Sequence, residues 1–175
     1  MQMASDPLSI SVAINKANLT CEMVKATGKF TASIISEDAT FDLFKRFGFQ
    51  SGRDVNKFAD FTDCKRLSNG TMAITTGTNS YISVEVTSTV DLGSHILFIG
   101  KPVEGENISK VPSATYAYYF ENIKPKPEKV GETKDGKTIW RCTICGYEYV
   151  GEESPDDFIC PICKHPASDF EKVTN

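Results

Sequence analysis

Residues 140–173 read WRCTICGYEYVGEESPDDFICPICKHPASDFEKV and contain two Cys-x-x-Cys pairs. Each pair presents two thiolates around a tight turn, and fourteen residues separate the pairs, so together they define a tetrahedral four-sulfur cage. The four candidate metal ligands are Cys142, Cys145, Cys160 and Cys163. Zinc and iron both accept such a cage, and ligand geometry alone does not choose between them. Two disulfides are the third alternative, which a reducing compartment disfavours.

Aromatic residues crowd around these cysteines and favour iron over a structural zinc ribbon. The five are Trp140, Tyr147, Tyr149, Phe158 and Phe170. A metal that carries one electron needs a dry and rigid surrounding, because little must reorganise when its charge changes. A structural zinc site does not need so many aromatic residues around it.

The segment Thr138–Val173 resembles the rubredoxin family in its CxxCGYxY opening, its PDDFxCPxC second pair and its closing DFE. The resemblance implies one iron atom, held by the four cysteines, that carries a single electron. The spacing between the pairs is shorter than in free-standing rubredoxins, and Lys164 stands where a glycine usually follows the fourth cysteine. We expect His165 to be an exposed polar residue rather than a fifth ligand.

Composition limits the other function classes. The 175 residues carry a net charge of -4, with no basic run that would indicate a nucleic-acid partner. No apolar run approaches the roughly 18 residues that a membrane span needs, and no signal-peptide pattern is found at the N-terminus. We therefore expect a cytoplasmic protein without a membrane or nucleic-acid partner.

The chain divides at residues 124–137, KPKPEKVGETKDGK, a charged stretch with two prolines and two glycines. This composition predicts a linker between a domain at residues 1–123 and a small metal-binding domain at residues 138–175. As a flexible coil the linker would span about 20 Å, so two redox centres on either side of it would be able to meet.

The first domain is predicted to be mostly β, and we expect a barrel. Its predicted strands include a hairpin through residues 91–93 and are Leu8–Ile14, Phe30–Ile35, Tyr81–Val90 and Ser94–Val103. Two short helices, at Leu19–Ala26 and Phe41–Phe47, are expected to end at Gly28 and Gly48.

Four segments of this domain, SISVAINKANLT, GKFTASIISEDATFDLFKRFGFQSGRDVNKF, LGSHILFIGKPV and TYAYYF, resemble the flavin reductase family. The resemblance runs from about Gln2 to Phe120. It implies a split β-barrel that binds FMN non-covalently, forms a homodimer and accepts a hydride from NADH or NADPH.

A first polar patch lies where a predicted strand ends and a helix begins. It consists of Asn15, Lys16, Asn18 and Thr20. The donors and the positive end of a helix suit the phosphate of FMN, and the resemblance assigns the patch that role. The alternative is an ordinary strand-to-helix turn that is capped by Asn18.

A second polar patch follows the second predicted helix and consists of Ser51, Gly52, Arg53 and Lys57. By resemblance this loop also reaches the cofactor. The alternative is a solvated loop in which Asp54 pairs with a neighbouring cation.

His95 matches the family's Gly-x-His position, and we expect it to be catalytic, facing the flavin or the nicotinamide; a structural histidine is the alternative. Cys21 and Cys64 have no partner spacing and are expected to be buried or idle thiols. The aromatic run at residues 116–120 is expected to lie in the core and on a dimer surface.

Gln2 matches the end of a flavin-gripping segment of the family, and the Ser-Asp-Pro turn at residues 5–7 follows it. The preceding Asn-Thr step and the opening strands of the barrel are not in the sequence. We expect the natural chain to begin further upstream; the alternative is a natural truncation that weakens the flavin site.

The resulting hypothesis is an NAD(P)H:flavin/rubredoxin oxidoreductase, in which FMN takes two electrons from NADH or NADPH and passes them singly to iron. The resemblance implies a diiron flavoprotein, which reduces oxygen or nitric oxide, as the redox partner. Acidic residues 152–153 and 156–157 are expected to steer that partner. The rival hypothesis is a non-enzymatic dimeric β-scaffold with a structural zinc ribbon that mediates protein contacts.

Overall fold

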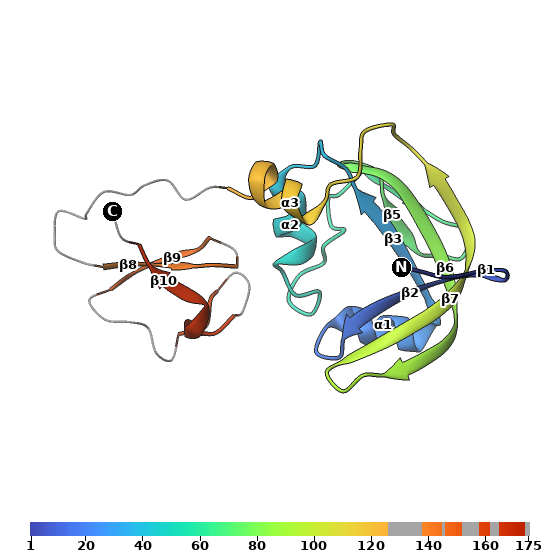
Figure 1. Cartoon of the computed structure of the whole chain (residues 1–175), viewed down its shortest axis with the longest axis horizontal. Coiled ribbons are helices and arrows are strands. Elements are labelled where there is room, and N and C mark those ends of the chain that lie inside the picture. The colour runs from blue at the N-terminus through green and yellow to red at the C-terminus, as the bar shows by residue number, and fades with distance from the viewer. Residues whose placement is uncertain (126–137, 145, 152–157, 162–164, 174–175) are drawn as a thin grey trace.

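The computed structural model describes residues 1–125, 138–144, 146–151, 158–161 and 165–173 (Figure 1). Most of the predicted linker, residues 152–157 with the four predicted acidic side chains, and Cys145, Cys163 and Lys164 lie outside these ranges. The described strands form a large sheet in the N-terminal domain, a short hairpin beside it and a small sheet near the C-terminus. The mostly β fold predicted from sequence is therefore confirmed.

The large sheet has five antiparallel strands in the order β1-β2-β7-β6-β3. They are β1 (Gln2–Ser5), β2 (Leu8–Asn15), β7 (His95–Asn107), β6 (Thr78–Asp91) and β3 (Lys29–Ile35). A second hairpin, β4 (Cys64–Arg66) with β5 (Met72–Ile74), contacts β3 and β6. The long strands β6 and β7 curve around the domain, as Figure 1 shows.

The predicted hairpin of β6 and β7 is present and is longer than expected at its open end. Gly93 has a positive φ of 84° in the turn, a conformation that glycine adopts without strain. Its N–H donates to the Asp91 carboxylate (2.8 Å), and the Leu92 N–H donates to the His95 carbonyl (2.9 Å). Residues 78–80 and 104–107 extend the pairing, although they lack the apolar alternation that predicts a strand.

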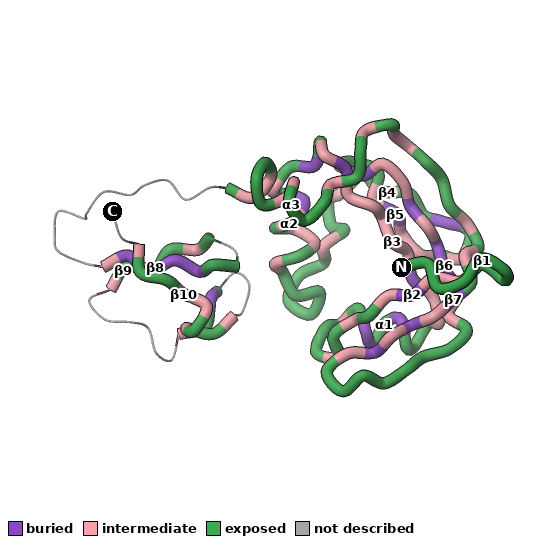
Figure 2. Tube along the Cα trace, viewed as in Figure 1, coloured by how far each residue is buried: buried purple, intermediate pink, exposed green. Residues whose placement is uncertain are grey.

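The core of the N-terminal domain lies between this sheet and helix α1 (Leu19–Thr27). Val84 and Phe98 are fully buried on neighbouring strands, and α1 contributes Cys21 and Val24. Figure 2 shows the buried positions following the sheet, with exposed positions along the rim. Cys21 is thus a core thiol, as expected, and Cys64 is half-buried.

Helix α1 ends at Gly28 as predicted, with a φ of 67° and its N–H donating to the Val24 carbonyl. The expectation for the second helix is wrong by one residue. Helix α2 spans Phe41–Gly48 and its C-cap is Phe49, whose N–H donates to the Phe44 carbonyl. Gly48 needs no positive φ there, so it does not act as the stop signal.

The aromatic run at residues 116–120 forms the short helix α3 (Tyr116–Tyr118) and the start of a π-turn, η1 (Tyr119–Ile123). Tyr119 stacks on Phe44 of α2 with ring centroids 4.6 Å apart, which joins the two helical segments. Tyr116 is 83% exposed and Phe120 is 50% exposed. These two side chains therefore do not lie in the core of the chain, and the expected dimer surface stays a prediction for them.

The C-terminal domain contains a three-stranded sheet in the order β10-β8-β9. Its strands are β8 (Thr138–Cys142), β9 (Glu148–Gly151) and β10 (Phe170–Lys172), with a 3-10 turn, η2 (Ala167–Asp169), before the last. Trp140, the single tryptophan, lies on the middle strand and pairs with Tyr149 and Lys172. A sheet this small cannot bury enough apolar surface to fold alone and needs a staple.

Across the described residues, no helix combines the length and the hydropathy required to cross a bilayer.

Candidate functional site

One cysteine from each predicted pair lies in a shared buried cluster in the C-terminal domain. Cys142 ends β8 and is 1% exposed, and Cys160 is 0% exposed. Cys145 and Cys163 fall outside the described residues. The other two predicted ligands come from distant segments of the sequence and meet in one cluster, and the assignment of all four as metal ligands stays a prediction.

The backbone around these two cysteines is tied down. Gly146 has a φ of 80° and donates its N–H to the Cys142 carbonyl (2.9 Å), while the Cys142 N–H donates to the Tyr147 carbonyl (2.9 Å). On the second segment the Cys160 N–H donates to the His165 carbonyl (2.9 Å). His165 places Nδ1 2.8 Å from the Asp169 carboxylate, and its side chain is half-buried rather than exposed as expected.

Aromatic rings surround the cysteine cluster. Tyr147 and Phe170 pack against it, and Phe158 joins them, with ring centroids 6.1 Å from Tyr147 and 5.5 Å from Phe170. Tyr149 lies 4.9 Å from Phe158 on the other side. A buried sulfur pair packed among aromatic rings is the dry surrounding that a one-electron iron centre requires. The described residues therefore fit the iron that was predicted.

The two polar patches predicted in the N-terminal domain meet at helix α1. Arg53 donates to both carboxylate oxygens of Glu22 (2.6 and 3.2 Å) across thirty-one residues of sequence. Gly52 approaches α1 so closely that a Cβ there would lie 3.1 Å from Leu19 Cδ2. The loop after α2 is thus held against the helix that begins at the first patch.

Asn18 occupies the N-cap position of α1, but its side chain makes no capping hydrogen bond. The turn is instead held by Asn15, whose Oδ1 accepts from the Ala17 N–H (2.9 Å). Asn18 therefore does not cap α1 through its side chain, and the alternative of an ordinary strand-to-helix turn stays open. The start of α1 keeps backbone donors and the side chains of Asn18 and Thr20 at the surface, where an anion is able to reach them.

The three cations of the patches have different partners. Lys16 forms an ion pair with Asp91 (2.7 Å), and this hydrogen bond, together with that of the Gly93 N–H, lowers the pKa of the Asp91 carboxyl. Arg53 pairs with Glu22 rather than with Asp54, which differs from the alternative of a loop paired through Asp54. The hydrogen bonds of Arg53 lower the pKa of the Glu22 carboxyl.

Lys57 is half-buried and differs from the other two cations. Its Nζ donates to the Phe47 carbonyl (2.8 Å), and no carboxylate pairs with it among the residues that the structure describes. Burial lowers the pKa of the Lys57 ammonium, since the charged form is desolvated without a counter-ion. An anionic group bound beside it would supply the missing partner.

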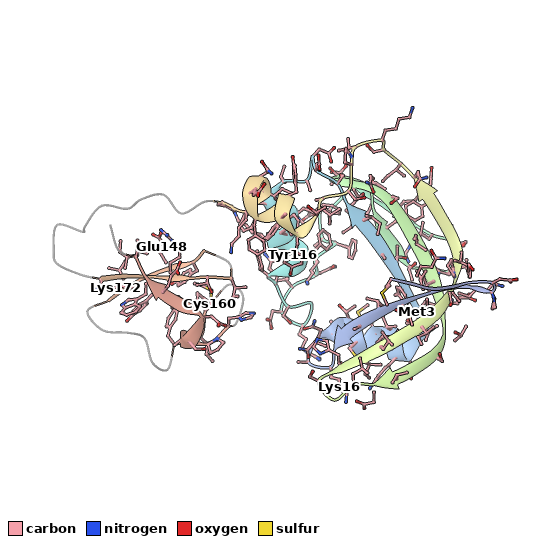
Figure 3. The ribbon with its side chains drawn as sticks, in the orientation of Figure 1. Met3, Lys16, Tyr116, Glu148, Cys160 and Lys172 are labelled. Atoms are coloured by element: carbon pink, nitrogen blue, oxygen red, sulfur yellow. The ribbon has the colours of Figure 1, made fainter. Side chains whose placement is uncertain are left out.

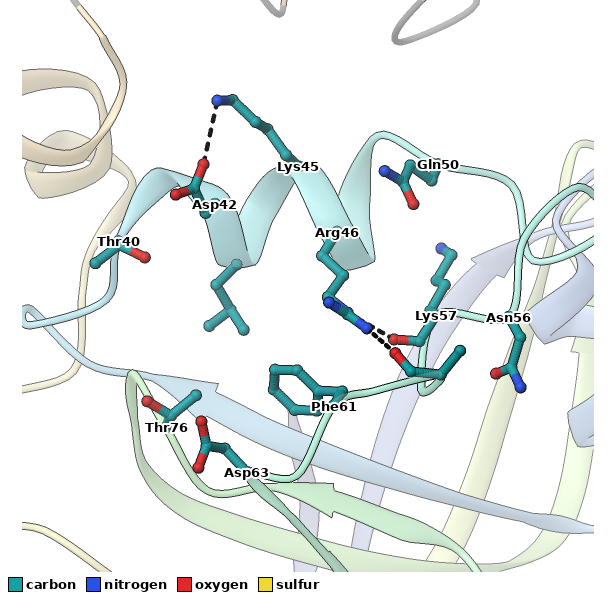
Figure 4. Close-up of a pocket in the computed structure, with 12 residues that line it drawn as sticks. Thr40, Asp42, Lys45, Arg46, Gln50, Asn56, Lys57, Phe61, Asp63 and Thr76 are labelled. Atoms are coloured by element: carbon teal, nitrogen blue, oxygen red, sulfur yellow. Dashed lines mark hydrogen bonds and ion pairs between the residues drawn. The ribbon is translucent and has the colours of Figure 1, made fainter.

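Lys57 lines a polar pocket between α2 and the following loop, together with Arg46, Gln50 and Asn56 (Figure 4). Arg46 donates its Nε to the Lys57 carbonyl (2.8 Å) and a terminal nitrogen to the Ala59 carbonyl. These bonds fix the loop backbone from which Lys57 extends. Sequence reasoning missed Arg46, Gln50 and Asn56, because helix-end and loop positions carry no local signal of a pocket.

His95 opens β7 directly opposite Asn15 of β2, so it lies beside the first patch. Its Nδ1 is 2.8 Å from the Ser94 hydroxyl oxygen, and the residue is half-buried. Gln2 pairs with Ile10, five residues along β2 from Asn15, which corresponds to about 17 Å at the usual strand rise. Within this chain the structure therefore brings His95, but not Gln2, to the loops at α1.

Comparisons with known proteins agree with this two-domain layout. The flavin reductase like domain matches residues 1–126, and the rubrerythrin, rubredoxin-like domain matches residues 140–171. High molecular weight rubredoxin of Moorella thermoacetica is 32% identical over 197 aligned positions, which cover 98% of this chain and 86% of that protein. Ferric-chelate reductase (NAD(P)H) of Archaeoglobus fulgidus is 32% identical over 67% of this chain and 69% of its own length.

Among solved structures, the FMN-binding protein of Thermus thermophilus superimposes with a TM-score of 0.55 at 24% identity. The match covers 62% of this chain and 58% of that one, and it shows a shared fold. The first family implies a flavin, and the rubredoxin-like domain implies iron. The chain belongs to the flavin reductase-like family and carries a rubredoxin-like domain at its C-terminal end.

Proposed function

We propose that the chain is an electron-transfer oxidoreductase that passes electrons from NADH or NADPH, through FMN, to an iron atom held by four cysteines. The observation that carries the proposal is the cysteine cluster of Cys142 and Cys160, enclosed by aromatic rings, in the same chain as a flavin reductase-like domain. When bound, FMN accepts two electrons as a hydride and releases them singly, which couples a nicotinamide to a one-electron metal.

The residues proposed to hold FMN are those of the two patches at α1. The phosphate is assigned to the helix start with Asn15, Lys16, Asn18 and Thr20, and to the loop of Ser51, Gly52, Arg53 and Lys57. Lys57 is the strongest candidate for the phosphate charge, because Lys16 and Arg53 are already paired with carboxylates. His95 is proposed to orient the nicotinamide or the flavin, and Gln2 to contact the cofactor from β1.

The proposed metal ligands are Cys142, Cys145, Cys160 and Cys163. Thiolate ligands need a compartment that keeps them reduced until metal binds, which supports a cytoplasmic location. We also propose a homodimer and, as electron acceptor, a redox protein such as a diiron flavoprotein. The name of the Moorella relative and the NAD(P)H in the name of the Archaeoglobus reductase support the route from nicotinamide to iron.

The proposal is tested by anaerobic titration of the purified chain with NADH and with NADPH. The isolated protein is expected to show the absorption of oxidised flavin and of ferric thiolate, and both bands are expected to bleach. Metal analysis is expected to give iron at one atom per chain. A colourless protein with one zinc atom per chain would rule out the proposed function, and bleaching by dithionite alone would refute the nicotinamide step.

The lowered pKa of Lys57 leads us to expect that flavin binding depends on pH. Because its pKa lies below the ordinary lysine value, the ammonium loses its proton earlier as the pH rises. FMN affinity is therefore expected to be constant near pH 7 and to fall about tenfold as the pH rises through the Lys57 pKa. Quenching of FMN fluorescence on binding measures this at each pH.

The variants Lys57→Met and Lys45→Met separate this effect from general alkaline loss. Lys45 lines the same pocket but pairs with Asp42 (3.1 Å). Lys57→Met is expected to bind FMN about tenfold more weakly at pH 7, with the alkaline step removed. Lys45→Met is expected to behave as the unmodified chain does. An alkaline step that persists in Lys57→Met would contradict the assignment.

A further inference from the structure

Phe49 connects the two domains. It caps α2 in the N-terminal domain, yet its ring packs against the buried cluster of Cys142 and Cys160 in the C-terminal domain. The other rings on that cluster, Tyr147 and Phe170, belong to the C-terminal domain itself. We propose that Phe49 docks the rubredoxin-like domain so that electrons pass from the flavin to the iron of the same chain, an inference that rests on the proposed function.

A second contact holds the same part of the C-terminal domain. Lys124 donates its Nζ to the Thr143 carbonyl (2.6 Å), which lies in the turn directly after Cys142. That turn is rigid, because the Thr143 N–H and hydroxyl both donate to the Asp169 carbonyl (2.8 and 3.0 Å). The Lys124 ammonium also lies 5.1 Å above the Phe120 ring, so it is anchored to the N-terminal domain.

The docking position is next to the proposed flavin loop. Phe49 precedes Ser51 by two residues, which a chain spans in at most about 7 Å. The Phe49 ring is itself supported by Phe41, with ring centroids 5.8 Å apart. Figure 3 shows Cys160 on the side of the C-terminal domain that is turned toward the N-terminal domain. The metal end therefore faces the loop from which electrons would come.

The transfer balances in electrons. One NADH or NADPH gives two electrons and leaves as the oxidised nicotinamide with release of one proton. The two electrons leave the flavin domain one at a time, and each reduces one ferric iron to ferrous iron. The iron must therefore be reoxidised by the acceptor between the two transfers. A docked domain keeps the same short distance between flavin and iron for both electron transfers. A domain on a free tether would instead meet the flavin by collision, at an effective concentration in the millimolar range.

Phe49→Ala tests the proposal against the control Leu92→Ala. Leu92 is an exposed apolar residue in the turn between β6 and β7, and it has no part in the cysteine cluster. Small-angle X-ray scattering is expected to show a larger maximum dimension for Phe49→Ala and no change for Leu92→Ala. In stopped-flow mixing with NADH, flavin bleaching is expected to keep its rate in both variants. Iron bleaching is expected to slow about ten- to a hundredfold in Phe49→Ala alone.

Phe49→Leu, which retains an apolar contact, is expected to recover much of the docking. Lys124→Met is expected to change scattering and iron bleaching in the same direction as Phe49→Ala, and it supplies the test if Phe49→Ala does not fold. Unchanged scattering and iron bleaching in Phe49→Ala would overturn the docking proposal while the proposed function stands. If NADH bleaches neither centre, the proposed function fails, and scattering still decides whether Phe49 docks the domains.

Discussion

Cys160→Ser is expected to remove iron from the chain and to unfold the C-terminal domain, while the N-terminal domain stays folded. Cys160 is completely buried, with 0% of its surface accessible to solvent, and belongs to the cysteine cluster. A domain below about 40 residues rarely folds without a staple, and metal binding to four cysteines contributes on the order of 10 kcal/mol to such folds. Losing one thiolate therefore removes most of the free energy that folds this sheet.

Metal analysis and ferric absorption measure the first effect, and protease cleavage within residues 138–173 measures the second. The iron content is expected to fall close to zero. Cys64→Ser is the matched control, because the Cys64 thiol donates to the Phe61 carbonyl (3.2 Å) in the N-terminal domain and a hydroxyl is able to do the same. Full iron content in Cys160→Ser, or iron loss in Cys64→Ser, would show that the ligand assignment is wrong.

Phe98→Ala is expected to destabilise the N-terminal domain and to leave the C-terminal domain and its iron in place. Phe98 is 0% exposed at the centre of the N-terminal core, where it packs with Val84 and with α1. Truncation of a buried phenylalanine costs about 3–5 kcal/mol through lost burial and the cavity that remains. Against a typical domain stability of about 5–15 kcal/mol, this change brings the N-terminal domain close to its unfolding threshold.

Urea unfolding followed by circular dichroism measures the loss, and ferric absorption reports the C-terminal domain in the same samples. The iron band is expected to persist at urea concentrations that unfold the N-terminal domain of Phe98→Ala. Leu92→Ala, at a turn residue that is 54% exposed, is expected to change stability by less than about 0.5 kcal/mol. If Phe98→Ala cost less than about 1 kcal/mol, the core assignment would be contradicted.

Local patterns account for the parts of the fold that were predicted. Alternating β-branched and apolar residues predict β2, β3 and the β6–β7 hairpin, and Gly28 marks the end of α1. The strand β1 was missed, since residues 2–5 are all exposed and do not alternate between apolar and polar side chains, and only their pairing with β2 makes them a strand. Gly48 was misplaced because a glycine predicts a helix end only where the backbone turns left-handed.

The same difference between local patterns and long-range contacts applies to the candidate sites. Cys142 and Cys160 could be named as candidate ligands because ligand spacing is a local property of the sequence. The ion pair of Arg53 with Glu22 and the contact of Phe49 with the cysteines were not, because each joins segments that are distant in sequence and follow no spacing rule. Asp54 is adjacent to Arg53 in sequence, but the loop lies against α1, where Glu22 is the partner of Arg53.

Trp140 gives the molecule a built-in optical reporter. It is the single tryptophan, it lies two residues before Cys142 on the middle strand of the small sheet, and its buried indole N–H has no hydrogen-bond partner among the described groups. Its emission therefore monitors the C-terminal domain alone, without a label. Because Trp140 lies two residues before the proposed ligand Cys142 on the same strand, iron binding and its loss are expected to appear as quenching and recovery of one fluorophore.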